Sequence, residues 1–423
     1  MNALSELAPL RQQGLVRGIT SVCSAHPSVI RATVRFARDS RTPILIEATC
    51  NQVNHQGGYT GMTPADFHAF VMAIAAEEQC PADLIMLGGD HLGPNVWRAL
   101  PSEEALHEAE EMIAAYVKAG FRKIHLDASM GCQGELQALD DATTAARAVR
   151  LAAVAERTAA QSNLPAPFYI IGTEVPPPGG ADHALSRVAP TPPEAAQHTI
   201  DVHRRVFLEA DLADAFARVI GLVVQPGVEF GNQNVVRYDR RLSRDLSAVL
   251  NAEPQWVFEA HSTDYQGPAP LAELVEDGFV ILKVGPELTF VLRETLYALD
   301  LIASDLLPDY GTRPLMQAME QLMRAQPEDW QRHYPGDPAE QRLMRHYSLS
   351  DRIRYYWPEP EANQAAQNLV KALSGQIIPQ ALFWQHLPEC SGFADQALDV
   401  EELLIWRISA RLQDYHRAGH PAG

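Results

Sequence analysis

An acid and an imidazole, Asp90 and His91, stand directly after a short apolar run and two glycines. The run, residues 84–87, is of the kind that forms a strand buried on both faces, and Gly88 and Gly89 free the backbone to turn where it ends. Ligands of parallel α/β sheets and barrels bind at these carboxyl ends of the strands. A single Asp-His pair is common on protein surfaces, so its meaning depends on whether the same arrangement recurs along the chain.

Polar side chains do follow the other apolar runs. In chain order they are Ser24 and His26, Glu47 and Asn51, Asp127 and Ser129, Glu174, Gln225 and Glu229, His261 and Asp264, and Lys283. A barrel would point all of them at one mouth. Any one of them could simply cap a neighbouring backbone group. Polar groups are costly to bury without a partner, so their recurrence at every strand end favours a shared site over separate backbone caps.

Imidazoles and carboxylates around one cavity suit a divalent cation, most simply Zn²⁺, with one coordination position open to substrate. We expect His91 and His261 to be ligands, with Glu174 as the third. A cation also removes the repulsion that a cluster of carboxylates would otherwise suffer. Proton transfer in such a site is assigned to Asp90, Asp127 and Glu174. Three further histidines are interpreted as structural: His68, His125 and His203.

Eight apolar runs of the buried-strand type position these groups. They cover residues 18–23, 43–49, 84–93, 123–127, 168–174, 219–225, 256–261 and 279–285. Helical patterns alternate with them, such as the one that Thr63 caps before Pro64 and the one that ends at Gly120. Eight is the number of strands that closes a barrel, so the pattern predicts an α/β fold, a (β/α)8 TIM barrel over residues 1–308. A doubly wound open sheet is the alternative, but no run is followed by GxGxxG or GxxxxGK[ST], the usual reason to prefer it.

After about Asp309 the alternation stops, and the remaining pattern predicts a helical extension over residues 309–423 packed on the barrel. The extension contains one unusual run, SLSDRIRYYWP, at residues 348–358. Its Arg352 and Arg354 could clamp a phosphate group bidentately. They could equally belong to an aromatic packing surface, and both interpretations stay open.

Composition limits the classes of partner. Lys and Arg number 34 against 53 Asp and Glu, a net charge of -19. This argues against a nucleic-acid or anionic-membrane binder, because both need clustered basic side chains. No apolar run approaches the ~18 residues of a membrane span, and residues 1–14 lack the basic start and apolar segment of a signal peptide. The five cysteines have no CxxC spacing, so we expect no disulfide framework or zinc knuckle, and a cytoplasmic location.

Several long strings of the sequence closely resemble one family. They are SVCSAHP (21–27), IEATCNQVN (46–54), GGYTGMTPADF (57–67), GGDHLGPN (88–95), KIHLDASM (123–130), GTEVP (172–176), VQPGVEF (224–230), EAHSTDYQ (259–266) and SLSDRIRYYWP (348–358). The family is the GatZ/KbaZ-type subunit of class II D-tagatose-1,6-bisphosphate aldolase, and the likeness covers nearly the whole chain. It implies catabolism of galactitol or N-acetylgalactosamine-type sugars in a bacterium. The chain would then be the non-catalytic partner that gives a separate catalytic barrel subunit full activity and stability, within an oligomer.

The catalytic class II aldolases are a more distant likeness. Their Asp-His after strand three, a general acid/base and a zinc ligand, looks like Asp90 and His91, and their histidine after strand seven looks like His261. Their phosphate-side segment at strand eight looks like Lys283-Val284. Where they carry a further zinc-binding histidine at strand six, this chain has Gln225, and glutamine is a poor zinc ligand. The same three-histidine site therefore cannot form.

Two functions follow from these observations. In the first, the chain is an accessory barrel whose remnant site binds a sugar phosphate or nothing. In the second, Glu174 replaces the missing histidine, and the chain is a metal-dependent enzyme that epimerises C4 of a ketose or its phosphate by retro-aldol cleavage and re-addition, with Asp90 moving the hydroxyl proton. Gln225 favours the first function, and the density of polar strand ends favours the second. The residues expected to contact the sugar are Ser24, His26, Glu47, Asn51, Gln225, Lys283, Arg352 and Arg354.

Overall fold

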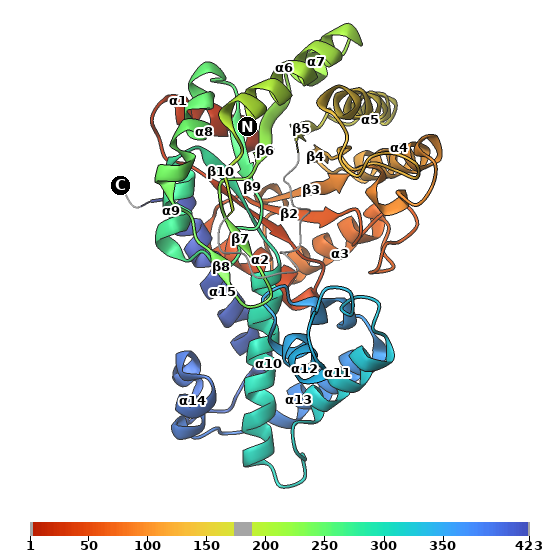
Figure 1. Ribbon diagram of the computed structural model, residues 1–423. Helices are drawn as coiled ribbons and strands as arrows, with labels where there is room; N and C mark the ends of the chain where they lie inside the picture. Colours follow the sequence, from red (N-terminus) through yellow and green to blue (C-terminus); the bar gives the residue numbers. More distant parts are fainter. Residues whose placement is uncertain (1–2, 173–187, 422–423) are drawn as a thin grey trace.

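Eight parallel strands close into a barrel in the computed structural model, which describes residues 3–172 and 188–421 (Figure 1). Around the barrel the order is β1-β10-β9-β6-β5-β4-β3-β2. The strands are β1 (Ile19–Cys23), β2 (Ile44–Thr49), β3 (Ile85–Leu92), β4 (Lys123–Leu126), β5 (Phe168–Ile171), β6 (Val219–Val224), β9 (Val257–Ala260) and β10 (Phe279–Val284). All eight predicted runs are strands, so the predicted (β/α)8 barrel is confirmed and the open-sheet alternative is wrong.

Closure is made by β1, which pairs with both the second and the last barrel strand. Ser21 lies opposite Leu45 on one side and opposite Lys283 on the other. The strands are buried along almost their whole length, as expected where helices cover the outer face of a parallel sheet. The covering helices are α2 (Pro27–Ser40), α3 (Pro64–Glu77), α4 (Ser102–Lys118), α5 (Asp141–Gln161), α6 (Pro193–Glu209), α7 (Ala213–Phe216), α8 (Arg240–Ala252) and α9 (Pro268–Glu276).

Short elements at both ends of the strands were not predicted from the sequence. Residues 3–12 form a helix, α1 (Ala3–Gln12), because Leu4 and Leu7 give it an apolar side that is buried against the barrel. After β6 the chain forms a small antiparallel hairpin of β7 (Glu229–Phe230) and β8 (Val235–Val236). Single 3-10 turns flank β3, namely η1 (Ala82–Leu84) and η2 (Pro94–Trp97).

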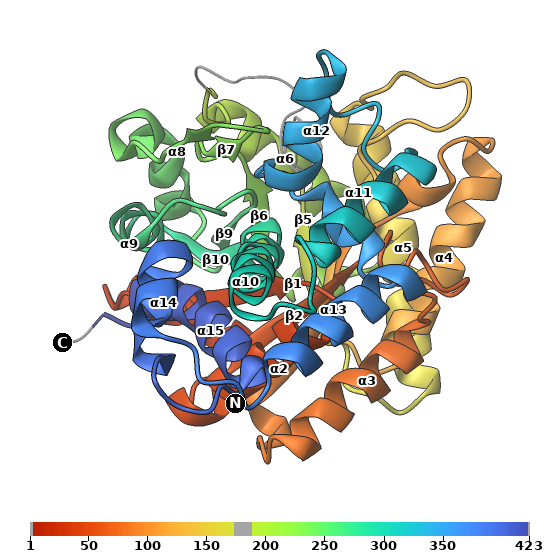
Figure 2. The ribbon, with the colours of Figure 1, turned by 90° about the horizontal axis from the view of Figure 1, so that it is seen from below.

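The helix that follows the eighth strand leaves the barrel. This helix, α10 (Pro286–Leu306), runs away from the strands and becomes the axis of the helical half, which Figure 2 shows end-on. Its place in the barrel wall is taken by α15 (Val400–Gly419), which packs on α2, α9 and β1. The last helix of the chain therefore completes the barrel although it lies within residues 309–423, and the division at residue 308 stays a proposal about folding units.

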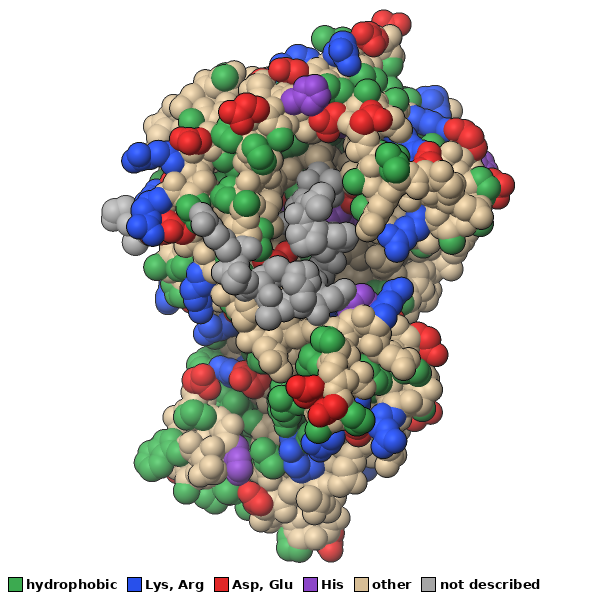
Figure 3. All heavy atoms as spheres, in the orientation of Figure 1, with side chains coloured by type: hydrophobic (Ala, Val, Ile, Leu, Met, Phe, Trp, Pro, Cys, Tyr) green, Lys and Arg blue, Asp and Glu red, His purple; other side chains and the backbone are tan. Residues whose placement is uncertain are grey.

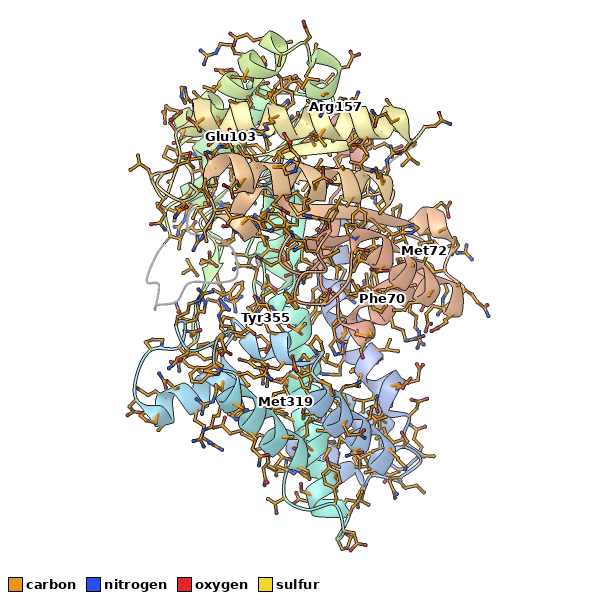
Figure 4. All side chains as sticks on the ribbon, turned by 90° about the vertical axis from the view of Figure 1, so that its right-hand side faces the viewer. Phe70, Met72, Glu103, Arg157, Met319 and Tyr355 are labelled. Atoms are coloured by element: carbon orange, nitrogen blue, oxygen red, sulfur yellow. The ribbon has the colours of Figure 1, made fainter. Side chains whose placement is uncertain are left out.

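The other helices of the extension surround α10. They are α11 (Pro314–Ala325), α12 (Pro338–Tyr347), η3 (Arg352–Tyr356), α13 (Pro360–Leu373), α14 (Gln380–His386) and η4 (Pro388–Phe393). Met319 lies in the core of this half, whereas Tyr355 lies at the level where it meets the barrel (Figure 4). Among the described residues, none of the helices is long and apolar enough to cross a membrane.

A buried ion pair fixes η3 at this junction. Asp351, which precedes η3 and has a left-handed backbone (φ 46°), accepts from Arg293 Nε of α10 at 3.0 Å and from Thr289 Oγ1 at 2.7 Å. The Arg293 and Asp351 side chains are 2% and 0% exposed. A buried charge without its partner is strongly destabilising, so each side chain requires the other.

We predict that Asp351→Ala lowers the free energy of unfolding by about 3–5 kcal/mol, because it leaves the Arg293 guanidinium buried without a counter-charge. Urea unfolding followed by circular dichroism measures this difference. Asp39→Ala is the control, since it breaks an exposed pair with Arg38 and should cost less than about 1 kcal/mol. Equal effects of the two substitutions would show that the junction does not depend on the buried pair.

Candidate active site

Three charged side chains meet inside the barrel below its mouth. Lys123 Nζ of β4 lies 2.7 Å from Glu47 Oε1 of β2 and 2.7 Å from Glu259 Oε2 of β9, and all three side chains are 0% exposed. Burial would lower the pKa of Lys123, but the charges of Glu259 and Glu47 raise it above 10.5. Burial would likewise raise the pKa of Glu259, but Lys123 and Lys283 hold it well below 4.5. Lys123 and Glu259 therefore stay ionised, and the three side chains form the floor of the site.

A second lysine links this floor to the acid after strand β3. Lys283 Nζ contacts Asp90 Oδ1 and lies 3.6 Å from Glu47 Oε2 and 3.6 Å from Glu259 Oε1. Burial by itself would raise the pKa of Asp90, but the neighbouring His91 ring and the Lys283 ammonium group outweigh it and hold that pKa well below 3.8. Asp90 is thus a carboxylate at neutral pH and can accept a proton or a cation.

Asp90 and three histidines, His91, His125 and His261, form one buried cluster. Each offers a ligand atom, and these atoms all lie within 4.8 Å of one another. His91 has a left-handed backbone (φ 50°), which is uncommon for a residue with a side chain and is found where a functional geometry is over-determined by its surroundings. The strand end therefore holds His91 in a conformation that turns its ring into the cluster.

A carboxylate outside the cluster orients the His91 ring. Asp127 Oδ2 lies 2.8 Å from His91 Nδ1, and because a carboxylate only accepts, Nδ1 carries the proton and Nε2 presents its lone pair. Burial raises the pKa of Asp127 in principle, but the hydrogen bond from His91 lowers it to about 2. Burial lowers the pKa of His91 below 6.5, so its ring is neutral at physiological pH. A neutral imidazole held by a carboxylate is the usual arrangement of a metal-ligating histidine.

The charge balance of this region also suits a divalent cation. Four carboxylates, those of Glu47, Asp90, Asp127 and Glu259, face two lysines in the connected network. Carboxylates therefore outnumber lysines in this network, an excess of acidic groups that suits a divalent cation. Glu259 also accepts from His261 Nε2 at 2.9 Å, which fixes that ring. The donor set His91, His261 and Asp90, with His125 beside it, therefore fits a metal such as Zn²⁺.

A cavity of about 970 Å³ opens above the cluster. The face drawn in Figure 3 is hollowed in its barrel half, above the extension. This volume lies within the 300–1,000 Å³ that is typical of pockets for small molecules. Its lining includes nine of the residues singled out from the sequence: Asn51, Asp90, His91, Asp127, Gln225, His261, Lys283, Arg352 and Arg354.

Three of the expected site residues, Ser24, His26 and Glu47, do not line the cavity. His26 Nδ1 accepts the Ser28 amide at 3.2 Å, and Ser24 Oγ accepts the His26 amide at 3.2 Å, so both side chains cap α2 rather than line the cavity. Glu47 lies in the floor and reaches the cavity only through Lys283. Glu174, the expected third ligand and a proposed proton-transfer group, falls outside the described residues.

Gln225, which stands at the position of the missing zinc-binding histidine, builds the loop after β6. Its Oε1 accepts the amides of Gly227 and Val228 at 2.7 and 2.9 Å. Its Nε2 is buried without a hydrogen-bond partner among the described residues. Since Gln225 lines the cavity, this N–H group is available to a bound hydroxyl.

His125 is the cluster member that the sequence interpretation set aside as structural. Its Nδ1 lies 3.2 Å from the His91 amide and 3.0 Å from Asp90 Oδ1, and its Nε2 lies 2.8 Å from the Gly172 carbonyl. Both nitrogens are thus engaged, and His125 either orients Asp90 or ligates after releasing Gly172. The sequence pattern that could have assigned His125 to the site is the alternation in and after β4, which puts residues 123, 125 and 127 on the same inner face.

Each comparison with known proteins matches nearly the whole chain. The family model described as D-tagatose-1,6-bisphosphate aldolase subunit GatZ/KbaZ-like matches residues 4–420. A curated relative from Agrobacterium fabrum (strain C58 / ATCC 33970), named D-tagatose 6-phosphate 4-epimerase, is 60% identical over 415 residues, which are 98% of this chain and 98% of the relative. A crystal structure from Sinorhizobium meliloti 1021, described as a probable tagatose 6 phosphate kinase, has a TM-score of 0.87 and 54% identity, covering 95% of this chain and 100% of that one. The likeness includes the barrel and the extension alike.

We predict about one divalent ion per chain after metal-replete purification, and a fall in metal affinity of at least roughly 100-fold in His91→Ala. The reason is that His91 Nε2 is the nitrogen its surroundings leave for a ligand bond. Inductively coupled plasma mass spectrometry of the two proteins measures the metal content. His68→Ala, a half-buried histidine of α3, is the control and should keep the ion. Equal metal content in all three proteins would place the ion elsewhere.

Proposed function

The chain belongs to the D-tagatose-1,6-bisphosphate aldolase subunit GatZ/KbaZ-like family, and from this premise we propose that it is a metal-dependent 4-epimerase of D-tagatose 6-phosphate. The curated relative of the same length carries the name of this reaction. The observation that carries the proposal is the buried cluster of Asp90, His91 and His261, connected to Lys283 at the base of a cavity. An accessory protein without chemistry would not need to maintain so many buried charges.

Epimerisation at C4 of a 2-ketose can run as a retro-aldol cleavage followed by re-addition. The Asp90 carboxylate takes the proton of the 4-hydroxyl, the C3–C4 bond breaks, and its electron pair passes into an enediolate of carbons 1 to 3. The aldehyde fragment turns to present its other face, the C3–C4 bond forms again, and Asp90 returns the proton to the new 4-hydroxyl. The reaction is balanced without an oxidant or a reductant, and D-fructose 6-phosphate is the product.

The side chains around Asp90 each support this sequence. Lys283 contacts Asp90 Oδ1 and favours the carboxylate, so Asp90 begins as the proton acceptor. Gln225 Nε2 offers a hydrogen bond to a sugar hydroxyl. Asp127 keeps the proton of His91 on Nδ1 throughout, because its own pKa is about 2. A divalent cation, when bound, supplies the positive charge that stabilises the enediolate.

A kinase activity, the description given to the Sinorhizobium meliloti protein, is not proposed for this chain. Transfer from a nucleoside triphosphate needs a loop that holds its phosphate groups. No GxxxxGK[ST] or GxGxxG sequence occurs after any of the eight barrel strands. The sugar phosphate in that description is the part that agrees with the proposed substrate.

The proposal predicts that Asp90→Asn lowers kcat on D-tagatose 6-phosphate by roughly 10²–10⁴-fold, because an amide cannot take the 4-hydroxyl proton. A coupled assay for D-fructose 6-phosphate measures the rate, and the metal content of the variant is determined alongside it. Asp39→Asn, on the surface of α2, is the matched control. With substrate deuterated at C4, the label should stay in the product. Exchange of the label with water would contradict cleavage between C3 and C4.

An accessory role remains a second proposal, favoured by the family description as an aldolase subunit. The extension exposes large apolar side chains that suit contact with another protein, namely Ile377, Trp384 and Trp406. Hydrophobic side chains gather over α14, at the lower left of Figure 3. The two roles are compatible, because this surface lies on the extension and the cluster lies in the barrel.

We predict that co-expression raises the soluble yield and the thermal midpoint of a catalytic class II tagatose-bisphosphate aldolase subunit. Trp384→Ser should reduce that effect, whereas His91→Ala should leave it in place, because the metal cluster is remote from the exposed surface. Differential scanning fluorimetry of the purified aldolase, alone and with each variant, measures the midpoint. An aldolase that is equally stable in all cases would contradict the accessory role.

A further inference from the structure

We infer that the helical extension supplies the phosphate-binding end of the substrate site, with Arg354 and Arg352 of η3 holding the phosphate group of the sugar. This inference rests on the proposed function, since it names how the same cavity recognises a phosphorylated ketose. It concerns a part of the site outside the buried cluster. It also gives the junction between the two halves of the molecule a role in substrate selection.

The usual phosphate position of a barrel is closed here. Phosphates in (β/α)8 barrels often bind at the loops after strands seven and eight, against a helix N-terminus. In this chain that helix is α10, and Asp264 Oδ1 accepts the amides of Gly285 and Glu287 at 3.0 and 2.8 Å. Pro286 between them has no N–H. Glu287 adds a second buried carboxyl group, which accepts the Tyr265 amide at 2.7 Å. A phosphate at this helix end would meet carboxyl groups instead of free amides.

Lys283, the lysine of the eighth barrel strand, is already paired with carboxylates. Lys283 contacts Asp90 and lies between Glu47 and Glu259, so its charge is balanced by three carboxylates before any substrate arrives. Among the described residues, the other Lys or Arg side chains along the cavity are Arg98, Arg352 and Arg354. The last two belong to one turn of η3, and Arg98 is exposed.

Arg354 has N–H groups that its hydrogen bonds to Ser350, Asp351 and Tyr355 do not use. Its Nη1 donates to the carbonyl oxygens of Ser350 and Asp351, and its Nη2 donates to Tyr355 Oη at 3.0 Å. A guanidinium has five N–H groups, so the Nε–H and one N–H of Nη2 are not used by these contacts. Arg354 forms no ion pair with a carboxylate of any described residue within 4.0 Å. A half-buried arginine of this kind, on a cavity wall, suits the bidentate binding of a phosphate dianion.

Tyr355 holds the two arginines beside each other. The Arg354 guanidinium lies 4.5 Å and that of Arg352 5.6 Å from the centre of the Tyr355 ring. The same ring packs edge-on against Tyr59, from the loop after β2, at 5.0 Å. The cavity is lined by Tyr59 and by three residues of η3, namely Arg352, Arg354 and Tyr355. The barrel and the extension therefore meet at the point where the two positive charges are presented.

The two interpretations of this run apply to different residues. Tyr356 and Trp357 are buried, and Trp357 packs edge-on against His26 at 6.2 Å, so they form the packing surface. Arg352, Arg354 and Tyr355 are only half-buried and face the cavity. The aromatic packing thus anchors the turn that carries the two arginines, and Arg352 Nη1 also donates to the Asp329 carbonyl at 2.9 Å.

The test compares wild-type protein, Arg354→Gln and Arg324→Gln, an exposed arginine of α11 away from the cavity. Isothermal titration with inorganic phosphate should show a fall in affinity of roughly 10–100-fold in Arg354→Gln and no fall in Arg324→Gln. The ratio of kcat/KM for D-tagatose 6-phosphate to that for D-tagatose should fall by a similar factor. Arg352→Gln should act in the same direction, which guards against a variant that fails to fold.

The outcomes separate this inference from the proposed function. Turnover of D-tagatose 6-phosphate with unchanged phosphate affinity and unchanged preference in both arginine variants would overturn the inference and leave the epimerase standing. Phosphate binding that depends on Arg354, without any turnover by the wild-type protein, would support the inference and remove the epimerase. No binding of inorganic phosphate or of D-tagatose 6-phosphate to the metal-loaded wild-type protein would overturn the inference.

Discussion

The contact on which the site depends is the bridge that Lys123 makes between Glu47 and Glu259 inside the barrel, at 2.7 Å to each. A buried lysine costs several kcal/mol unless it is paired, and two carboxylates this close would repel each other without it. The bridge fixes Glu259, which in turn holds His261, and both carboxylates attract Lys283, which holds Asp90. Most barrels fill such layers with branched apolar side chains. Here charged side chains occupy such positions and hold Asp90 and His261 in place.

The extension is more than an addition to this framework. The Asp351–Arg293 pair anchors η3 on α10, the Tyr59–Tyr355 contact joins η3 to the barrel, and α15 returns to complete the barrel wall. These three connections tie η3, on the wall of the cavity, to the barrel. In the proposed function, chemistry and recognition are divided in space: the strand ends hold Asp90 and the histidine cluster, and η3 holds Arg352 and Arg354.

The sequence predicted the frame of the molecule better than its site. Eight apolar runs alternating with helices leave little choice of fold, and the strand ends at Asp90, His91 and His261 were found for the same reason. His125 was set aside because it looks like any histidine in an alternating strand, and the register in which β3 pairs with β4 brings it to Asp90. Ser24 and His26 lie at the start of α2 and do not line the cavity, because a polar strand end that caps the next helix has the same local pattern as one that binds a ligand. The return of α15 to the wall depends on tertiary packing, which no local pattern in residues 400–419 reveals.

The central claim is that the chain by itself performs a metal-dependent epimerisation at its buried Asp and His cluster. The most direct measurement is a ³¹P NMR time course of D-tagatose 6-phosphate with the purified chain, in the absence of any aldolase subunit, before and after treatment with EDTA and after Zn²⁺ is restored. We expect conversion to an equilibrium mixture with D-fructose 6-phosphate, its loss with EDTA and its return with the metal. An unchanged substrate spectrum in the metal-loaded sample, or conversion that EDTA does not affect, would contradict it.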